Sequence, residues 1–165
     1  MSAPTSEVHL ERELDAFIGI IRHYFLRVGG SAPEMLTAEL EWKPSPRLAK
    51  TGYMIVGGLV DGWVAISLPD AMLLHLLERL GEPLRDEAAL LDLSAEMASV
   101  ITSNARAHFG ERLRVAPPVA VRHTDPDPVL GQPGVCFKLP FLWQQQEGFL
   151  RIALLSAPVG QPSLS

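Results

Sequence analysis

The chain has 165 residues, of which 47% are hydrophobic and 20% are charged, and its formal net charge is −5 at pH 7. This length suits one domain with a buried core, and the composition is too apolar for a disordered protein. The negative charge, without a cluster of Lys and Arg, argues against nucleic acid or an anionic membrane as the main partner. Cys136 is the single cysteine, so an intramolecular disulfide is excluded.

The N-terminal segment predicts a cytoplasmic protein. Residues 1–15 have neither the basic start nor the apolar run of a signal peptide. The apolar run at residues 17–21 (FIGII) is short and is followed by Arg22 and His23, so we expect no membrane span. A lone cysteine also fits a reducing compartment.

The first half of the chain predicts one helix followed by three strands. Apolar residues recur at helical spacing from Ser6 to Val28, and Gly29-Gly30 is expected to end the helix. Residues 35–43 (MLTAELEWK) alternate apolar and polar side chains, which is typical of a half-buried strand. Residues 53–68 predict a hairpin with Asp61-Gly62 as its two-residue turn, because this pair tolerates positive φ.

The second half predicts two helices followed by three strands. A helix is expected from Asp70 to Leu80, with Gly81 at its C-terminal end. After an acidic connector, a long helix spans residues 91–110, with Asp92 or Ser94 as its N-cap. Three strand-like segments and a loose tail follow, at residues 114–123, 135–146, 148–156 and 157–165.

These elements predict a single α+β domain over residues 1–165, with its core at about residues 6–156. The order is α-βββ-αα-βββ, and the short connections between strands favour a largely antiparallel sheet. A helix followed by three strands occurs in both halves, which indicates an internal repeat of architecture.

We expect no metal site and no cofactor. The five histidines are scattered, and no His, Cys or carboxylate partner lies at typical ligand spacing. Asp125 and Asp127 stand between prolines, as in a solvated turn. Cys136 lies in an apolar strand and is interpreted as a core residue. Neither a phosphate-binding glycine loop nor a nucleophile elbow is present.

The long helix carries the residues that are candidates for chemistry. At 100° per residue, Asn104 falls within the apolar arc of the helix, so we expect a buried structural amide bonded to a neighbouring strand. Glu96, Ser99, Ser103 and Arg106 form a polar stripe beside that arc. Glu96 and Ser99 lie one turn apart on one face of the helix. The two residues can form a functional pair, or Glu96 can be a solvated glutamate that is favourable near the start of the helix.

This helix resembles the signature helix of the CheC/CheX/FliY family, which dephosphorylates the chemotaxis response regulator CheY. Asp92, Glu96, the Ser99 position and residues 103–110 (SNARAHFG) carry the resemblance, and Asn104-Ala105 matches a second Asn-Ala pair of CheX members. Three further segments are similar to the family: residues 57–69 (GGLVDGWVAISLP), 76–82 (LLERLGE) and 139–143 (LPFLW). The similarity extends from about Leu36 to Leu155, and the order of elements is also similar to CheX.

The resemblance implies a site and a partner. Glu96 is implied to pair with a lysine of a CheY-like receiver, with Asp92, Ser103 and Arg106 as further partner-binding residues. The family amide at position 99 is implied to hold a water in line with the phosphoaspartate, and any Mg²⁺ would be carried by the receiver. CheX members also dimerise through their sheets, so a homodimer is implied.

The sequence departs from the family at position 99, where Ser99 replaces the asparagine of Glu-x-x-Asn. The shorter hydroxyl would hold the water more than about 1 Å from the amide's position, and misplacement on that scale costs about 10²-fold. We therefore rank receiver binding first and hydrolysis second. An inactive CheX-like scaffold and an unrelated ligand-binding α+β domain are the alternatives. CheC carries Glu-x-x-Asn on two helices, but Leu14 and Ala16 follow Glu11 and Glu13 here.

Overall fold

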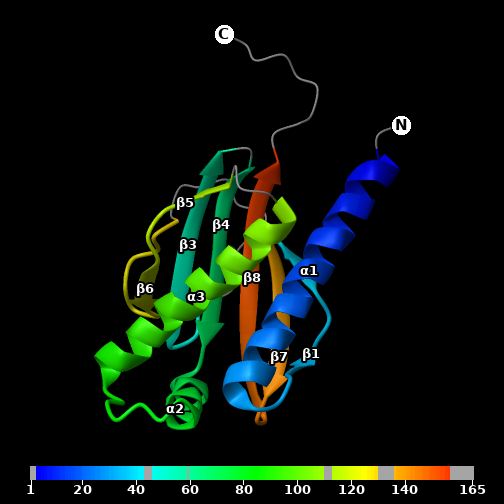
Figure 1. Ribbon diagram of the computed structural model, residues 1–165. Helices are drawn as coiled ribbons and strands as arrows, with labels where there is room; N and C mark the ends of the chain where they lie inside the picture. Colours follow the sequence, from blue (N-terminus) through cyan, green and yellow to red (C-terminus); the bar gives the residue numbers. More distant parts are fainter. Residues whose placement is uncertain (1–2, 43–45, 59, 110–112, 130–135, 157–165) are drawn as a thin grey trace.

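The computed structural model describes residues 3–42, 46–58, 60–109, 113–129 and 136–156, and it has three helices packed on a sheet (Figure 1). The helices are α1 (Ala3–Gly29), α2 (Asp70–Arg79) and α3 (Glu87–Phe109). The strands are β1 (Glu34–Met35), β2 (Glu39–Glu41), β3 (Lys50–Gly58), β4 (Val60–Leu68), β5 (Leu113–Val115), β6 (Val119–Arg122), β7 (Cys136–Trp143) and β8 (Gln146–Ser156). The predicted α+β class is confirmed. None of the helices in this part of the chain is long and apolar enough to span a membrane.

The strands form one eight-stranded sheet in the order β1-β7-β8-β4-β3-β5, with β2 also on β7 and β6 also on β3. Every pairing among the described strands is antiparallel. The hairpins β3–β4 and β7–β8 meet at the centre through β4 and β8, from Val60↔Ser156 to Ser67↔Phe149. The outer strands are each broken in two, which explains why six predicted strands are observed as eight.

The two halves of the chain exchange their broken strands. β1 and β2 of the first half pair with β7 of the second half, and β5 and β6 of the second half pair with β3 of the first. In both halves the earlier fragment pairs with the end of the hairpin strand and the later fragment with its beginning. The repeat seen in the order of elements is therefore also a repeat of strand pairing.

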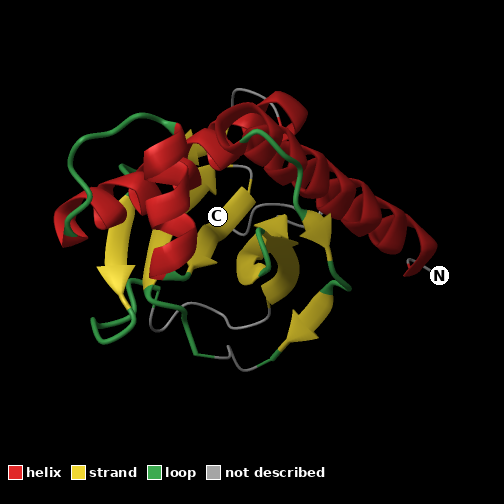
Figure 2. Cartoon of the chain, turned by 90° about the horizontal axis from the view of Figure 1, so that it is seen from below, coloured by secondary structure: helices red, strands yellow, loops and turns green. Residues whose placement is uncertain are grey.

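All three helices cover one face of the sheet, as Figure 2 shows from below. The main core lies between these layers, with Phe17, Ile21 and Phe25 of α1 and Met97 and Ile101 of α3 fully buried. A second, smaller cluster lies on the other face of the sheet and is made of Tyr53, Trp63, Ala65, Val121, Val129, Cys136 and Ala153. Cys136 is therefore a core residue, as predicted.

Both hairpin turns differ from the sequence prediction. Asp61 and Gly62 lie inside β4, with Gly62 opposite Val56, so they are not the turn. The printed pairing of β3 with β4 ends at Val56↔Gly62, and Gly58, two residues beyond Val56, has φ +102°. In the second hairpin Gln144 and Gln145 form the turn with φ 51° and 65°, where a continuous strand to Gln146 was predicted. Both residues adopt the left-handed region that two-residue hairpin turns require, and glutamine carries no signal for it.

Candidate functional site

Helix α3 begins one turn earlier than predicted, and its start is held at several points. The Asp86 carboxylate accepts a hydrogen bond from Ala89 N at 2.9 Å, so Asp86 is the N-cap, in place of the predicted Asp92 or Ser94. The buried Lys50 Nζ donates to Asp70 Oδ1 at 2.9 Å and lies 3.8 Å from Glu87 Oε1. Lys50 thus joins the first turns of α2 and α3 to β3.

Four of the predicted site residues form one exposed ridge along α3. Asp92, Glu96, Ser99 and Ser103 recur at intervals of four, three and four residues, which places them on one side of the helix. Asp92, Glu96 and Ser103 are exposed, and Ser99 is half-buried. At a rise of about 1.5 Å per residue, Glu96 and Ser99 lie about 4.5 Å apart along the axis. Their side chains can therefore reach the same partner surface.

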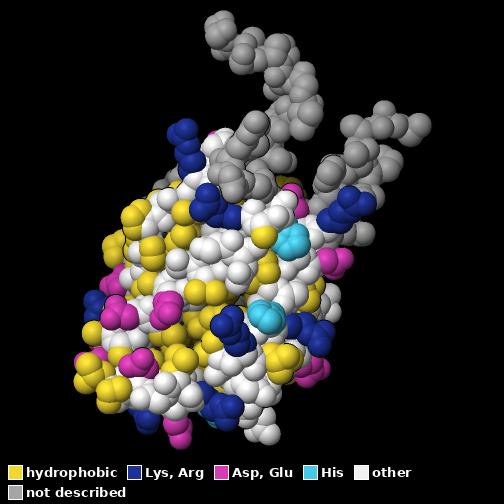
Figure 3. Space-filling view, in the orientation of Figure 1, with side chains coloured by type: hydrophobic (Ala, Val, Ile, Leu, Met, Phe, Trp, Pro, Cys, Tyr) yellow, Lys and Arg dark blue, Asp and Glu magenta, His cyan; other side chains and the backbone are white. Residues whose placement is uncertain are grey.

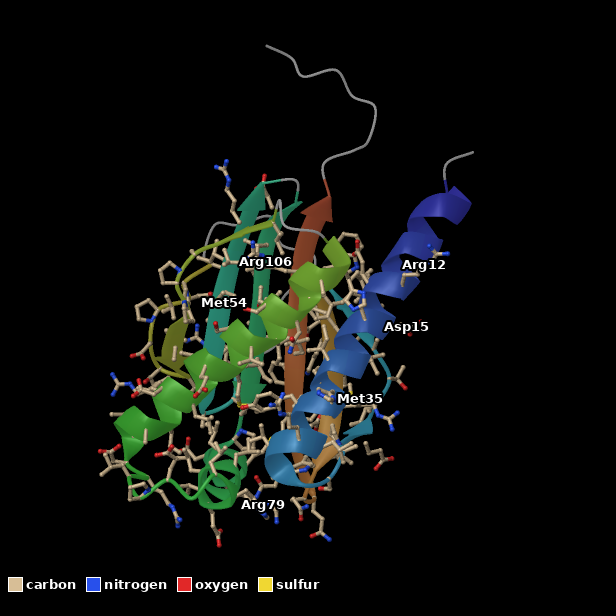
Figure 4. All side chains as sticks on the ribbon, viewed as in Figure 1. Arg12, Asp15, Met35, Met54, Arg79 and Arg106 are labelled. Carbon is tan, nitrogen blue, oxygen red and sulfur yellow. The ribbon has the colours of Figure 1, made fainter. Side chains whose placement is uncertain are left out.

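Arg106 lies further along α3, toward its C-terminal end (Figure 4). It follows Ser99 by seven residues, about 10 Å along the helix axis, and its side chain is half-buried. The arginine and His108 are the basic groups of the last turn, where positive charge is favourable with the helix dipole. The ridge is thus acidic toward the start of α3, and basic groups lie beyond its other end.

The prediction for Asn104 is wrong, because this side chain is exposed. Leu93 has nearly the same angular position on the helix and is buried, close to Leu77 of α2. Helix α2 covers the first turns of α3 only, so the same side of α3 is open at Asn104. A single angular arc does not describe burial along a helix whose neighbours change from turn to turn.

Glu96 lies between α1 and an open depression. The charge of Glu96, second to burial, raises the pKa of Tyr24 in α1, so the carboxylate and the phenol are near each other. On its other side is a depression of about 240 Å³ lined by Leu77, Leu80, Glu82, Leu84, Ala89, Asp92, Leu93 and Glu96. Figure 3 shows hydrophobic side chains in the hollow between α2 and α3, with acidic side chains over the first half of α3.

Sequence reasoning missed the part of this depression that α2 and the connector supply. Leu80 and Leu84 are 46% and 70% exposed, and both line the depression. Leu84 stands alone among polar residues in the connector that precedes α3. An isolated leucine between Pro83 and Arg85 was the available signal.

The described residues contain no group of three or more His, Cys, Asp and Glu side chains that could hold a metal ion. The carboxylates of the segment 125–127 make local contacts. Asp125 Oδ1 accepts from Arg122 at 3.1 Å, which, with a backbone bond from the same residue, lowers the Asp125 pKa. Asp127 Oδ1 accepts from Val129 N at 3.0 Å. The bonds to Arg122 and Val129 are those of a turn, and Asp127 Oδ1 also lies 4.0 Å from Arg47 Nη1.

The sequence profile of the family described as chemotaxis phosphatase CheX matches residues 51–139, more than half of the chain. The chain belongs to the CheX family. The matched part contains β3 except Lys50, together with β4, α2 and all of α3, and therefore every residue of the ridge. The predicted membership in the wider CheC/CheX/FliY family is confirmed.

Solved structures share the CheX fold at low identity. The CheC-like superfamily protein from Shewanella sp. PV-4 has a TM-score of 0.73 and 17% identity, over 87% of this chain and 97% of that one. Chemotaxis protein CheX from Vibrio vulnificus has a TM-score of 0.71 and 19% identity, over 87% and 99%. The CheX–CheY–BeF₃–Mg²⁺ complex from Borrelia burgdorferi matches with a TM-score of 0.66 and 17% identity, over 88% and 96%. No curated protein sequence matches the chain.

In this CheX-family chain the repeat leaves one candidate site among the described helices. Gly29 and Phe109 end α1 and α3, and Glu39 and Val119 begin β2 and β6, so about 80 residues separate equivalent positions. This offset aligns the fully buried pairs Phe17 with Met97 and Ile21 with Ile101. It also places Ala16 and Gly19 of α1 where α3 has Glu96 and Ser99. Alanine and glycine have no group that could pair with a lysine or hold a water.

Proposed function

We propose that this chain binds a CheY-like receiver domain of chemotaxis signalling through the ridge of α3, and that it hydrolyses the receiver's phosphoaspartate weakly or not at all. The observation that carries the proposal is an exposed Glu96 one turn before Ser99 on a helix backed by the sheet. A CheX of the same fold has been crystallised with CheY, BeF₃ and Mg²⁺. The partner and the location in the cytoplasm are extended to this chain from its family.

In the proposed complex, Glu96 pairs with a lysine next to the phosphoaspartate of the receiver. Such a charge-assisted pair fixes the position of α3 over the acyl phosphate. Asp92, Ser103 and Arg106 extend the contact along the helix, with acidic groups at one end and Arg106 at the other. This chain needs no metal of its own, since the receiver carries the Mg²⁺ that neutralises the phosphoryl oxygens.

Hydrolysis depends on a water held in line with the bond to be broken. An amide accepts a hydrogen bond from this water and can donate elsewhere, as the water-orienting glutamine of GTPases does. Ser99 can also bond to a water, but its hydroxyl is closer to the helix and holds the water further from phosphorus. The misplacement is more than about 1 Å, which corresponds to a loss of about 10²-fold.

The test follows the decay of a phosphorylated CheY-like receiver from the same genome, with Mg²⁺ and after removal of the phosphodonor. Wild-type chain, Ser99→Asn and Glu96→Ala are compared. We expect Ser99→Asn to accelerate decay by about 10²-fold over the wild type, because it restores the amide. Ser103→Asn places the same amide one turn further along the ridge and should not accelerate decay.

The outcomes separate two functions. If the wild type binds the receiver without changing its decay, and Ser99→Asn accelerates the decay, the chain is a binding module with a degenerate site. Wild type that accelerates decay means a phosphatase that uses the serine. If no variant binds or affects any receiver, the proposed function is wrong.

We further propose a homodimer, extended from CheX members that associate through their sheets. Light scattering at several concentrations tests this point, and a constant monomer mass would contradict it.

A further inference from the structure

The depression beside Glu96 has an apolar lining that the fold leaves open. Met72, Leu73, Leu76 and Leu77 of α2 are buried, and the next apolar residue in the helical pattern is Leu80. Helix α2 ends at Arg79, and Gly81 with φ +72° turns the chain away, so Leu80 stays 46% exposed. Leu84 follows in the connector and is 70% exposed. Burial of two such leucines by a partner is favourable because it removes apolar surface from water.

The size of the depression favours a side chain as its occupant. Its volume of about 240 Å³ is below the roughly 300–1,000 Å³ of small-molecule sites. It is also open to solvent and is lined by residues of two helices and of the connector between them. A single large apolar side chain on the surface of a folded partner fits these properties.

The rim of the depression determines the charge of that partner. Glu82, Asp92 and Glu96 all line it, and each is exposed. No basic side chain is among the lining residues of this depression. The apolar side chain that enters is therefore expected to have a lysine or arginine as a surface neighbour, since complementary charges guide encounter and exclude acidic partners.

The depression and the ridge form one continuous surface. Asp92 and Glu96 belong to both, and Ser99 is one turn beyond Glu96. A receiver domain that covers Glu96 and Ser99 is far wider than one helical turn, so it also extends along α3. Toward the N-terminal end of α3, the surface it meets is this depression.

We propose that the depression between α2, the connector and α3 is a docking pocket for an exposed apolar side chain of the receiver, with a lysine or arginine beside it. This inference rests on the proposed function and adds a second anchor to it. In the proposed complex, Glu96 and Ser99 contact the phosphorylated centre, which is common to receiver domains. The pocket binds a surface side chain outside that centre. It therefore favours receivers that have an apolar residue at this position.

The experiment measures binding of the full-length chain to a CheY-like receiver of the same genome, activated with beryllofluoride and Mg²⁺. Leu80→Ala and Leu84→Ala are compared with Leu40→Ala, a matched control in β2 with 48% exposure. We expect each pocket variant to weaken binding about five- to tenfold, mainly through faster dissociation, since a buried leucine contact is lost. Leu40→Ala should stay within twofold of the wild type. All three leucines are exposed, so the variants are expected to fold.

The rim is tested by charge. Glu82→Gln should slow association and reduce the dependence of the association rate on salt, because a rim carboxylate acts by steering. Glu39→Gln in β2 removes a carboxylate that is also exposed but lies away from the depression, and it should change neither rate.

Three outcomes would overturn the inference. If Glu96→Ala weakens binding while both pocket leucine variants bind like the wild type, the pocket is wrong and the proposed function stands. If the wild type binds no receiver, both are wrong. If Leu84→Ala instead changes the mass of the chain alone in light scattering, the depression is an interface between copies of this chain.

Discussion

Gly52 of β3 lies directly beneath the backbone carbonyl of Ser94 in α3, so close that a Cβ at position 52 would collide with that oxygen. Ser94 is fully buried, and its hydroxyl donates to Leu90 O at 2.9 Å within the helix. Glu96 follows two residues later on the outer side. The contact between Gly52 and Ser94 therefore determines how high the ridge stands above the sheet.

Gly52→Ala is expected to lower the free energy of unfolding by about 3 kcal/mol, because the added methyl group must push α3 off the sheet. Urea denaturation measures this change. Gly57→Ala in the same strand is the matched control, since its new Cβ would meet only Asp61 Oδ1, at 3.5 Å. If the Gly52→Ala protein is as stable as the Gly57→Ala protein, α3 does not pack against β3 as closely as the contact between Gly52 and Ser94 indicates.

The ion pair between Arg151 and Glu41 offers a second prediction. Arg151 Nε donates to Glu41 Oε1 at 2.9 Å, and the two side chains are 4% and 10% exposed. Removal of one partner leaves a buried charge, so Glu41→Gln should cost about 3–5 kcal/mol of stability. The double variant Glu41→Gln with Arg151→Met should recover most of this loss. A double-mutant cycle measures the coupling, and additive single effects would argue against a buried pair.

Cys136 predicts a loss of stability in alkali. Burial first, and the charge of Glu41 second, raise the thiol pKa from its ordinary 9.0 to about 11. The unfolded chain thus loses this proton at lower pH than the folded chain. The contribution of the thiol to stability is complete below pH 9 and is lost as the pH rises toward 11.

Unfolding by urea at several pH values from 8 to about 11 tests the thiol. Cys136→Ala should have a flatter decline of stability over this interval than the wild type. Alkylation of native Cys136 should also be slow at pH 8, and fast once the chain is unfolded, because the thiolate is the nucleophile. Equal pH profiles for the two proteins would contradict the shift.

Asn104→Ala tests the corrected position of the asparagine. An exposed side chain in a helix predicts a change within about 0.5 kcal/mol, on the stabilising side because alanine favours helix. Ile101, in the preceding turn, is fully buried in the structure. Its replacement by alanine should therefore lower the free energy of unfolding by about 2–5 kcal/mol. Thermal and urea unfolding compare the two. If Asn104→Ala lowers the free energy of unfolding by more than about 1 kcal/mol, the side chain is buried as the sequence predicted, and the corrected position is wrong.

Much of the fold followed from local signals in the chain. Helix α1 ends at Gly29, with Gly30 at φ +83°, and Gly81 follows α2 at φ +72°, as the glycines predicted. The stripe of Glu96, Ser99 and Ser103 lies at the surface of α3, since helical spacing alone groups these side chains. Roles for these residues stay predictions.

Other features had no local signal. The breaks between β1 and β2 and between β5 and β6 depend on which hairpin strand each fragment pairs with. The turn at Gln144-Gln145 is imposed by the pairing of β7 with β8 on both sides. The close approach at Gly52 required knowledge of which strand lies under α3.

The sequence by itself determined the class of fold, the helices and the family, because side-chain periodicity, glycine positions and motif order are local properties of the chain. Tertiary structure decided which positions are covered. Leu93 and Asn104 share one side of α3, yet α2 buries the first and nothing described covers the second. In the sequence, Leu80 and Leu84 do not differ from other apolar residues. The structure shows that both line the depression next to Glu96, beyond the end of α2. Burial depends on neighbours distant in sequence, and for that reason only the folded chain defines the surface that a receiver would meet.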